Sequence, residues 1–435
     1  MGSRSGRLAV IAGAVTLLAS ATAAHAQGSA PPEPDGYSHY WPGACVQAMS
    51  RSRNFYWRAR EDTALYTPAR DTLLDDVRRV ARDCTAKFGA TAATLTGNNL
   101  LPLAQVLLAA GDEAGAKAAV NRRLAEADVK SVAPRAWTLA QIVELFLDTR
   151  PARVDIAKSY LTQLDALKGD DAAPGQVRAW LSLAEHYESS ADEVNTRAAS
   201  EETIKAGKRL NTHDRIEFSS MVMGAYRNLA EAEADRTGDA AAPRAVLVRA
   251  TADIGKLPRM AATLAAYDTL YSRYGTKGPT VTADLWIGTA TDTVYPKSGK
   301  LTVLNFRPSR WTVPATRRLS RQVGDSLDVA LVYGTVGYFR GLGPLTMGTE
   351  VPEVRKYFFD ELKIPGSLAI TETKYHRMPD GRRVSDSNAN DRAYRTGQGT
   401  SIVVLDRQGI IRRIWSYWSN AYEPRIVAAL QKYNK

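Results

Sequence analysis

A short apolar run that leads into a helix constrains this chain more than any other feature. Residues Leu301–Phe306 read LTVLNF, are rich in β-branched and aromatic side chains, and have polar residues on both sides. Such a run predicts a strand that is buried on both faces of a sheet. Pro314 suits the first turn of a helix. The residues that follow share one helical face at Ala315, Leu319 and Val323. We therefore expect a helix N-terminus, with its free N–H groups, directly after the strand.

Strand and helix patterns then alternate to the end of the chain. They predict strand 301–306, helix 314–323, strand Asp328–Tyr333, helix Val351–Lys363, strand Ser367–Thr371, strand Thr400–Asp406, strand Gly409–Trp415 and helix Tyr422–Tyr433. A polar insertion, Glu372–Gly399, separates the third and fourth of these strands. Before the first strand, Asp284–Tyr295 predicts a β-hairpin. Gly275–Thr280 reads GTKGPT and marks the boundary of this region, because Gly and Pro interrupt the helical period there.

The pattern from Thr67 to Tyr274 is helical almost throughout. Small residues recur in four segments that each resemble a tetratricopeptide-type helical hairpin, at irregular spacings, near Leu103, Leu139, Leu183 and Gly224. Stacked hairpins bury a continuous core and can present a concave face to a protein partner. We expect an irregular α-solenoid over residues 45–275. The alternative is a solenoid that packs only against its neighbouring domain.

The segment after the first strand resembles the active-site segment of peroxiredoxins, in the alkyl hydroperoxide reductase/thiol-specific antioxidant family. The family pattern F-x-P-x-x-x-T-x-x-C meets Phe306, Pro308, Thr312 and Ala315 at its four fixed positions. The thioredoxin pattern W-C-x-P-C fits only with one inserted residue and also finds no cysteine. The resemblance implies a thioredoxin-like fold, in the order βαβαββα, over residues 281–435.

The resemblance also shows what this chain lacks. Ala315 stands where the family has its peroxidatic cysteine. Thr400 stands where thioredoxins have a proline and peroxiredoxins commonly have an arginine. A peroxidase needs a thiolate, and no other side chain here replaces it. We therefore expect no catalytic residue, with Pro308, Thr312, Ala315 and Thr400 as degenerate positions. The site retains three residues that we expect to bind an anion or a carboxylate-bearing partner: Arg307, Arg310 and Trp311. No cofactor or metal motif accompanies them.

Two cysteines occur in the sequence, Cys45 and Cys84. An even count in an exported protein favours a structural disulfide. A redox-active pair is the alternative, but the sequence contains no C-x-x-C, and Cys84 lies inside the predicted helix Thr67–Phe88 rather than at its start.

The N-terminus has the features of an export signal. Met1–Ala26 has two arginines, an apolar run and an A-x-A site, which together predict a cleaved signal peptide. Residues 27–44 begin with a Pro- and Gly-rich stretch and are expected to form a disordered leader. No later segment approaches the ~18 apolar residues of a membrane span. The mature protein is therefore expected to be secreted or periplasmic, without a membrane span.

Positive charge is concentrated in the C-terminal region. The chain has a net charge of +11, and residues 281–435 contain 23 Lys and Arg against 14 Asp and Glu, which is +9. Basic residues flank an aromatic group there: Arg407, Arg412, Arg413, Trp415, Tyr417, Trp418 and Tyr422. This mix suits an anionic component of the envelope. Because the protein is exported, we expect no nucleic-acid partner. The alternative is a solvated basic face above core aromatics.

Together these features predict an α+β multidomain protein, with an α-solenoid followed by a thioredoxin-like α/β domain. Two functions follow from different classes. The first is a non-catalytic binding or scaffold protein of the cell envelope, a pseudoenzyme with a degenerate active site. The second is a thiol–disulfide oxidoreductase or peroxidase that acts in envelope redox homeostasis.

Overall fold

The computed structural model describes the chain from residue 41 onward, with gaps. The described residues are 41–49, 66–149, 151–288, 295–296, 299–308, 312–335, 339, 342–343, 345–361, 363, 366–372, 375–377, 383–385, 389–394, 401–415 and 423–434. The helices of the N-terminal part are α2 Tyr66–Phe88, α3 Leu100–Ala110, α4 Glu113–Ala125, α5 Val132–Leu147, α6 Val154–Asp165, α7 Ala173–Ser189, α8 Glu193–Lys208, α9 Thr212–Glu217, α10 Ser219–Thr237, α11 Ala241–Ile254 and α12 Met260–Tyr271.

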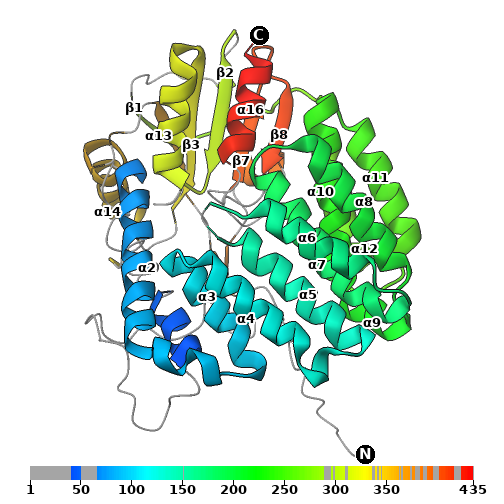
Figure 1. Cartoon of the computed structure of the whole chain (residues 1–435). Coiled ribbons are helices and arrows are strands. Elements are labelled where there is room, and N and C mark those ends of the chain that lie inside the picture. Colours follow the sequence, from blue (N-terminus) through cyan, green and yellow to red (C-terminus); the bar gives the residue numbers. More distant parts are fainter. Residues whose placement is uncertain are drawn as a thin grey trace, which may run out of the picture.

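The C-terminal part contains a six-stranded mixed sheet in the order β1-β4-β3-β2-β7-β8. Its elements are β1 Leu285–Gly288, β2 Leu301–Phe306, α13 Thr312–Val323, β3 Leu327–Gly334, α14 Met347–Arg355, β4 Ser367–Thr371, β7 Ser401–Leu405, β8 Ile411–Trp415 and α16 Glu423–Tyr433. In Figure 1 the helices from α2 to α12 form an arc that runs from α2 on the left, along the lower side, to α10 and α11 on the right, and the sheet stands above that arc. The α+β organisation predicted from the sequence is confirmed.

The helical hairpins follow directly from local sequence. At the turn between α3 and α4, Gly111 adopts a left-handed φ of 95° and ends α3. Asp112 then caps α4, because its carboxylate accepts a hydrogen bond of 2.8 Å from the N–H of Gly115. The predicted small residues lie where neighbouring helices approach, and four are fully buried: Ala104, Ala140, Ala184 and Ala225. The segments predicted as helical hairpins lie on consecutive helices that contact each other, in the pairs α3–α4, α5–α6, α7–α8 and α10–α11.

Close approach of successive hairpins requires small residues at particular positions. A Cβ atom on Gly175 of α7 would lie 2.5 Å from the carbonyl oxygen of Ala136 on α5. Glycine at this position therefore lets the two helices touch at the backbone, and this contact continues the core from one hairpin to the next.

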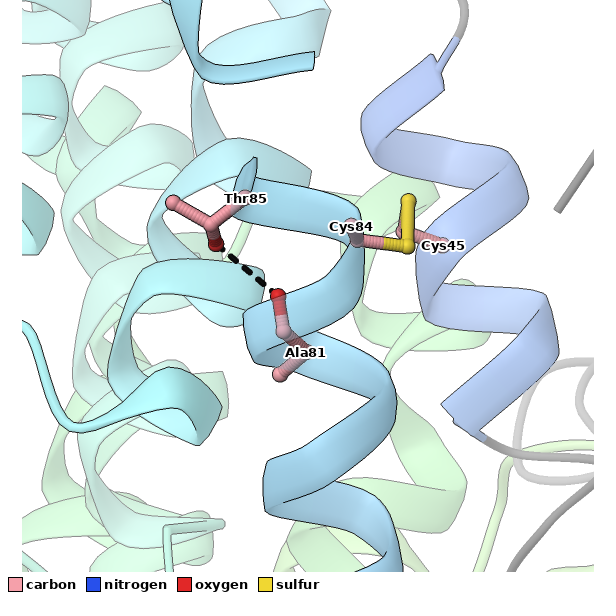
Figure 2. Close-up of a disulfide and its surroundings, with 4 residues drawn as sticks. All are labelled: Cys45, Ala81, Cys84 and Thr85. Carbon is pink, nitrogen blue, oxygen red and sulfur yellow. Dashed lines mark hydrogen bonds between the residues drawn. A yellow bond between two sulfur atoms is a disulfide. The ribbon is translucent and has the colours of Figure 1, made fainter. Parts of the chain in front are cut away.

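A disulfide holds the first end of the helical arc (Figure 2). Cys45, on a helix at residues 41–49, is bonded to Cys84 on α2, with 6.1 Å between the Cα atoms. Trp41 stacks on Phe88 nearby, with 5.3 Å between ring centroids. Both sulfur atoms belong to buried residues. The predicted disulfide is confirmed, and so is the position of Cys84 inside a helix.

The expected disordered leader, residues 27–44, is wrong at its C-terminal end. Residues 41–44 are helical, because Trp41 is buried against Phe88 and the disulfide fixes the segment. The predicted signal peptide, 1–26, and the rest of the leader lie outside the described residues. In the part of the chain that the structure describes, no helix combines the length and apolar character that a membrane crossing needs.

The sheet is covered differently on its two faces. Strands β2, β3 and β4 are parallel and follow one another outward in the sheet. Right-handed crossovers place both connecting helices, α13 and α14, on the same face. Side chains of odd-numbered β2 residues, such as Val303, pack there with Leu319 of α13 and Ile426 of α16. Even-numbered residues, such as Phe306, point to the opposite face.

That opposite face shares its core with the helical arc. Phe306 and Val332 of the sheet belong to one hydrophobic cluster with Tyr271 at the end of α12, with Tyr274 in the turn after it, and with Tyr226 of α10. The predicted boundary at 275–280 marks where the helices end, but the core continues across it. The chain at the boundary bonds to the sheet, because the N–H of Gly275 donates to the carbonyl oxygen of Ile411 at 2.8 Å.

Three details of the C-terminal region differ from expectation. The helix predicted at Val351–Lys363 begins earlier, at Met347, because Thr346 and Thr349 form a capping box. It then continues as a π-helix, Lys356–Glu361. The hairpin predicted at Asp284–Tyr295 is represented among the described residues by β1, which pairs with β4; residues 289–294 lie outside them. The polar insertion contains structure of its own: β5 Tyr375–Arg377, β6 Arg383–Ser385 and α15 Ala389–Tyr394.

Candidate functional site

The site predicted from the sequence lies where the parallel strands end. Because β2, β3 and β4 are parallel, their carboxyl ends meet at one edge of the sheet, the usual place for ligands in open α/β sheets. Backbone hydrogen bonds link these ends. The N–H of Arg307 donates to the carbonyl oxygen of Val332 at 2.9 Å, and the N–H of Thr335 donates to that of Thr371 at 3.0 Å. Arg307, Thr335 and Thr371 thus lie along one edge.

Arg307 has an unusual backbone. Its φ is +51°, in the left-handed region that non-glycine residues seldom adopt. Such a conformation costs about 1 kcal/mol or more and persists only where the surroundings enforce it. Pro308, which follows, is buried. The strand therefore turns sharply at this point, and the half-buried Arg307 is held at the strand end.

Helix α13 begins directly after this turn, as predicted. The backbone of Thr312 and of Ala315 lies in its first turn, which places the position matched to the family's cysteine at a helix N-terminus. The side chains of these two residues lie outside the described part of the chain. Three further predicted site residues lie wholly outside the described part of the chain, backbone included: Arg310, Trp311 and Thr400. Among the described residues, the structure therefore brings together Arg307, Pro308 and the first turn of α13.

A buried polar pair fixes α13 against β2. The side-chain amide of Asn305 donates to the hydroxyl of Thr316 at 3.0 Å, and both residues are fully buried. The amide oxygen of Asn305 has no hydrogen-bond partner among the described atoms. Sequence reasoning missed this pair, although a polar residue inside the apolar run Leu301–Phe306 was the signal.

A second buried pair lies one strand away. The hydroxyl of Tyr333, at the end of β3, donates to the carboxylate of Glu350 at 2.6 Å. Glu350 is fully buried in the first turn of α14, where a helix dipole favours a negative charge. No sequence motif marks this pair, because its members come from different elements.

A cluster of buried charges joins the sheet to the helical arc. Arg413 of β8 contacts Glu231 at 2.6 Å and Asp235 at 2.9 Å, both on α10. Arg425 of α16 contacts Asp235 at 2.6 Å and also binds Glu188 of α7. Burial alone would lower the pKa of Arg413, but the charges of Asp235 and Glu231, together with smaller effects of Tyr274 and Tyr271, outweigh it, so the pKa of this guanidinium lies above its usual range. We refer to the five charged residues as the junction cluster.

The junction cluster corrects one expectation from the sequence. Arg413 was predicted as part of a basic surface, but its side chain is completely buried and ion-paired. Trp415 is buried as well, and Arg412 pairs with Asp406 at 2.7 Å. Arg407 remains exposed. The remaining aromatic residues predicted for this surface lie outside the described residues: Tyr417, Trp418 and Tyr422.

One set of potential metal ligands occurs within the described residues. Ligand atoms of His213, Asp214 and Glu217 lie within 4.8 Å of one another on α9. His213 and Glu217 are exposed, and α9 has six residues. Exposed groups of this kind are common without an ion, so we assign no metal to them.

No family model, curated protein or solved structure matches this chain.

Proposed function

We propose that this is an exported thioredoxin-fold protein of the cell envelope, with a degenerate active site, and that it acts by binding rather than by catalysis. The state of its cysteines carries the proposal. Cys45 and Cys84 are the two cysteines of the sequence, and they are bonded to each other and buried. No thiol therefore remains for the strand end after Phe306, where thiol peroxidases and oxidoreductases need a thiolate.

The order of elements supports the thioredoxin-like assignment. From β2 onward the described chain reads β2-α13-β3-α14, then β4 and the insertion, then β7-β8-α16. Apart from β4 and the insertion, this is the βαβαββα order expected from the resemblance. The family's cysteine position, Ala315, lies in the first turn of α13 directly after the central strand β2.

Two features support binding. Arg307 stands at the end of β2, five residues before the start of α13, so we expect its charge and the helix dipole to act on the same region. This arrangement suits an anion or a carboxylate of an envelope component. The helical hairpins supply a second surface, of the kind that binds protein partners in other stacked-hairpin proteins.

The absence of thiol chemistry is tested with the complete mature chain, because its sheet shares a core with the helical arc. We expect no peroxide consumption and no insulin reduction by the native protein. An Ala315→Cys variant should acquire a thiol that is alkylated faster than that of a matched Ala245→Cys variant, which places the thiol on an exposed face of α11. Turnover by the native chain would overturn the proposal.

The binding role of Arg307 is tested with an anionic polymer such as polyglutamate. Replacing Arg307 by Ala should weaken binding by up to about fivefold, the value of one partly exposed charge contact. Replacing the exposed Arg407 by Ala serves as the control, because it removes the same charge elsewhere on this basic region. Equal losses in both variants would show a diffuse charge effect instead of a site.

A further inference from the structure

A buried polar pair lies in the apolar contact between β2 and α13. The side chains of β2 that face this helix come from its odd-numbered residues, and Leu301 and Val303 are buried there among apolar groups. Asn305 is the next residue on that face, and it is also fully buried. On α13, Leu319 belongs to the same apolar cluster, and Thr316 lies three residues before it. The hydrogen bond of 3.0 Å that the amide of Asn305 donates to the hydroxyl of Thr316 is thus a polar contact within an apolar interface.

Stability alone does not account for this pair. The amide oxygen of Asn305 has no hydrogen-bond partner among the described atoms, and a polar atom buried in that state lowers stability. A leucine at this position would continue the apolar run and would leave no polar atom buried. The pair instead supplies direction. Apolar contacts leave a helix free to slide along a strand because they have no preferred geometry, whereas a hydrogen bond requires a particular distance and angle.

The position of the pair along the chain shows what it fixes. Asn305 lies two residues before Arg307, and Thr316 lies one residue after Ala315. The pair therefore joins the end of β2 to the beginning of α13. We define the strand-end site as Arg307 together with the first turn of α13. The N–H groups of a first helical turn have no partner within the helix and carry the positive end of its dipole. Their position relative to Arg307 depends on how α13 lies against β2.

We propose that Asn305 is a positioning residue of the strand-end site. Its hydrogen bond to Thr316 holds α13 against β2 so that the N-terminus of the helix lies at the strand end, beside Arg307. A residue of this kind acts through the groups that bind the ligand and does not touch the ligand itself. The inference rests on the proposed function, the binding of an anion at this site, and adds the residue that fixes the geometry of the site.

A thiol in the first turn of α13 reports the position of the helix relative to Arg307 without any ligand. In the mature chain, Ala315→Cys supplies one free thiol, because both native cysteines are bonded to each other. A nearby positive charge favours the thiolate. Adding Arg307→Ala should therefore lower the acid dissociation constant of this thiol by up to about fivefold, the value of one partly exposed charge contact. Thiolate absorbance measured against pH gives the constant. Adding Arg407→Ala, which removes an exposed arginine elsewhere, should leave it unchanged.

The role of Asn305 is tested by removing its hydrogen bond in that background. Thr316→Val removes the acceptor, and the double variant Asn305→Leu with Thr316→Val also removes the buried amide, so that no polar group of the pair remains. In both, the effect of Arg307→Ala on the thiol should fall to less than about half, because α13 is no longer held beside Arg307. Thr316→Ser keeps the hydroxyl and should keep the full effect. Val143→Ala, at a buried position on α5, lowers stability far from the pair and should also keep it.

Two results would overturn the inference. One is a full effect of Arg307→Ala on the thiol in the double variant, with circular dichroism establishing that the variant is folded. The other is no effect of Arg307→Ala when Asn305 and Thr316 are intact, since Arg307 and the helix N-terminus then form no common site. The proposed function is decided separately, by polyglutamate binding that depends on Arg307. If that binding is present, the double variant should bind polyglutamate up to about fivefold more weakly than the native chain.

Discussion

Arg425 and Glu188 form a buried ion pair although 237 residues separate them in the sequence. Arg425 lies near the start of α16 and Glu188 near the end of α7, so the pair joins the last helix of the chain to the middle of the helical arc. Arg425 also contacts Asp235 of α10. The pKa of Arg425 lies above its usual range, because the charges of Asp235 and Glu188 outweigh the effect of burial.

We expect Arg425→Ala to reduce the free energy of unfolding by about 3–5 kcal/mol, because it leaves buried carboxylates without their partner. Guanidinium unfolding of the full chain at neutral pH measures the change. Arg407→Ala, which removes an exposed arginine that contacts Asn434, should change stability by about 0.5 kcal/mol or less. A similar small loss in both variants would show that the junction cluster contributes little.

The disulfide should be structural and inert. Closing a loop between residues 39 apart stabilises a protein by up to about 4 kcal/mol in the loop-entropy description. The double variant Cys45→Ser and Cys84→Ser should lose stability of that order, and thiol titration of the native protein should find no free thiol. Rapid alkylation of the native protein under mild reduction would instead favour the redox interpretation.

The hydrogen bond between Asn305 and Thr316 should show strong coupling. Thr316→Val leaves the buried amide of Asn305 without its acceptor and should cost about 1–3 kcal/mol. Adding Asn305→Leu removes the buried amide that lacks a hydrogen-bond acceptor. The double variant should therefore recover part of the lost free energy of unfolding. A double-mutant cycle by chemical unfolding measures the coupling. Strict additivity of the two single effects would contradict the assignment.

Export should remove the first 26 residues. The charged start, apolar run and A-x-A site predict cleavage after Ala26. Intact-mass measurement of the protein from the exported fraction should therefore find Gln27 at the N-terminus. Met1 retained in that fraction would argue against the predicted secretion.

Much of the fold could be predicted because its signals are local. The strand Leu301–Phe306 was predicted with the bounds that β2 has, because a continuous apolar run needs burial on both faces. The hairpins could be predicted because close helix packing demands small residues where helices touch, as at Ala140 and Ala184. The helix start at Met347 was missed, because the pair Thr346 and Thr349 gives a weaker signal than Ser/Thr followed by Glu.

The candidate site could be predicted only in part, because its remaining features depend on distant partners. From the sequence alone, Arg413 is predicted to be a surface charge. Its burial follows from its contact with Glu231, which lies 182 residues away in the sequence. Tyr333 and Glu350 likewise meet only when β3 and α14 pack together. Asn305 is the exception, since a polar residue within a buried strand already indicates a partner.

The junction cluster also changes how the helical arc responds to force and to ligands. A free stack of hairpins behaves as a spring, because each unit touches only its neighbours. Here α16 is bonded to two successive units at once, through Arg425 to Glu188 of α7 and to Asp235 of α10. Bending the stack at that joint would separate buried opposite charges. The sheet therefore acts as a brace that fixes the curvature of the arc, so the protein partner that we propose would meet a rigid surface whose shape is already set.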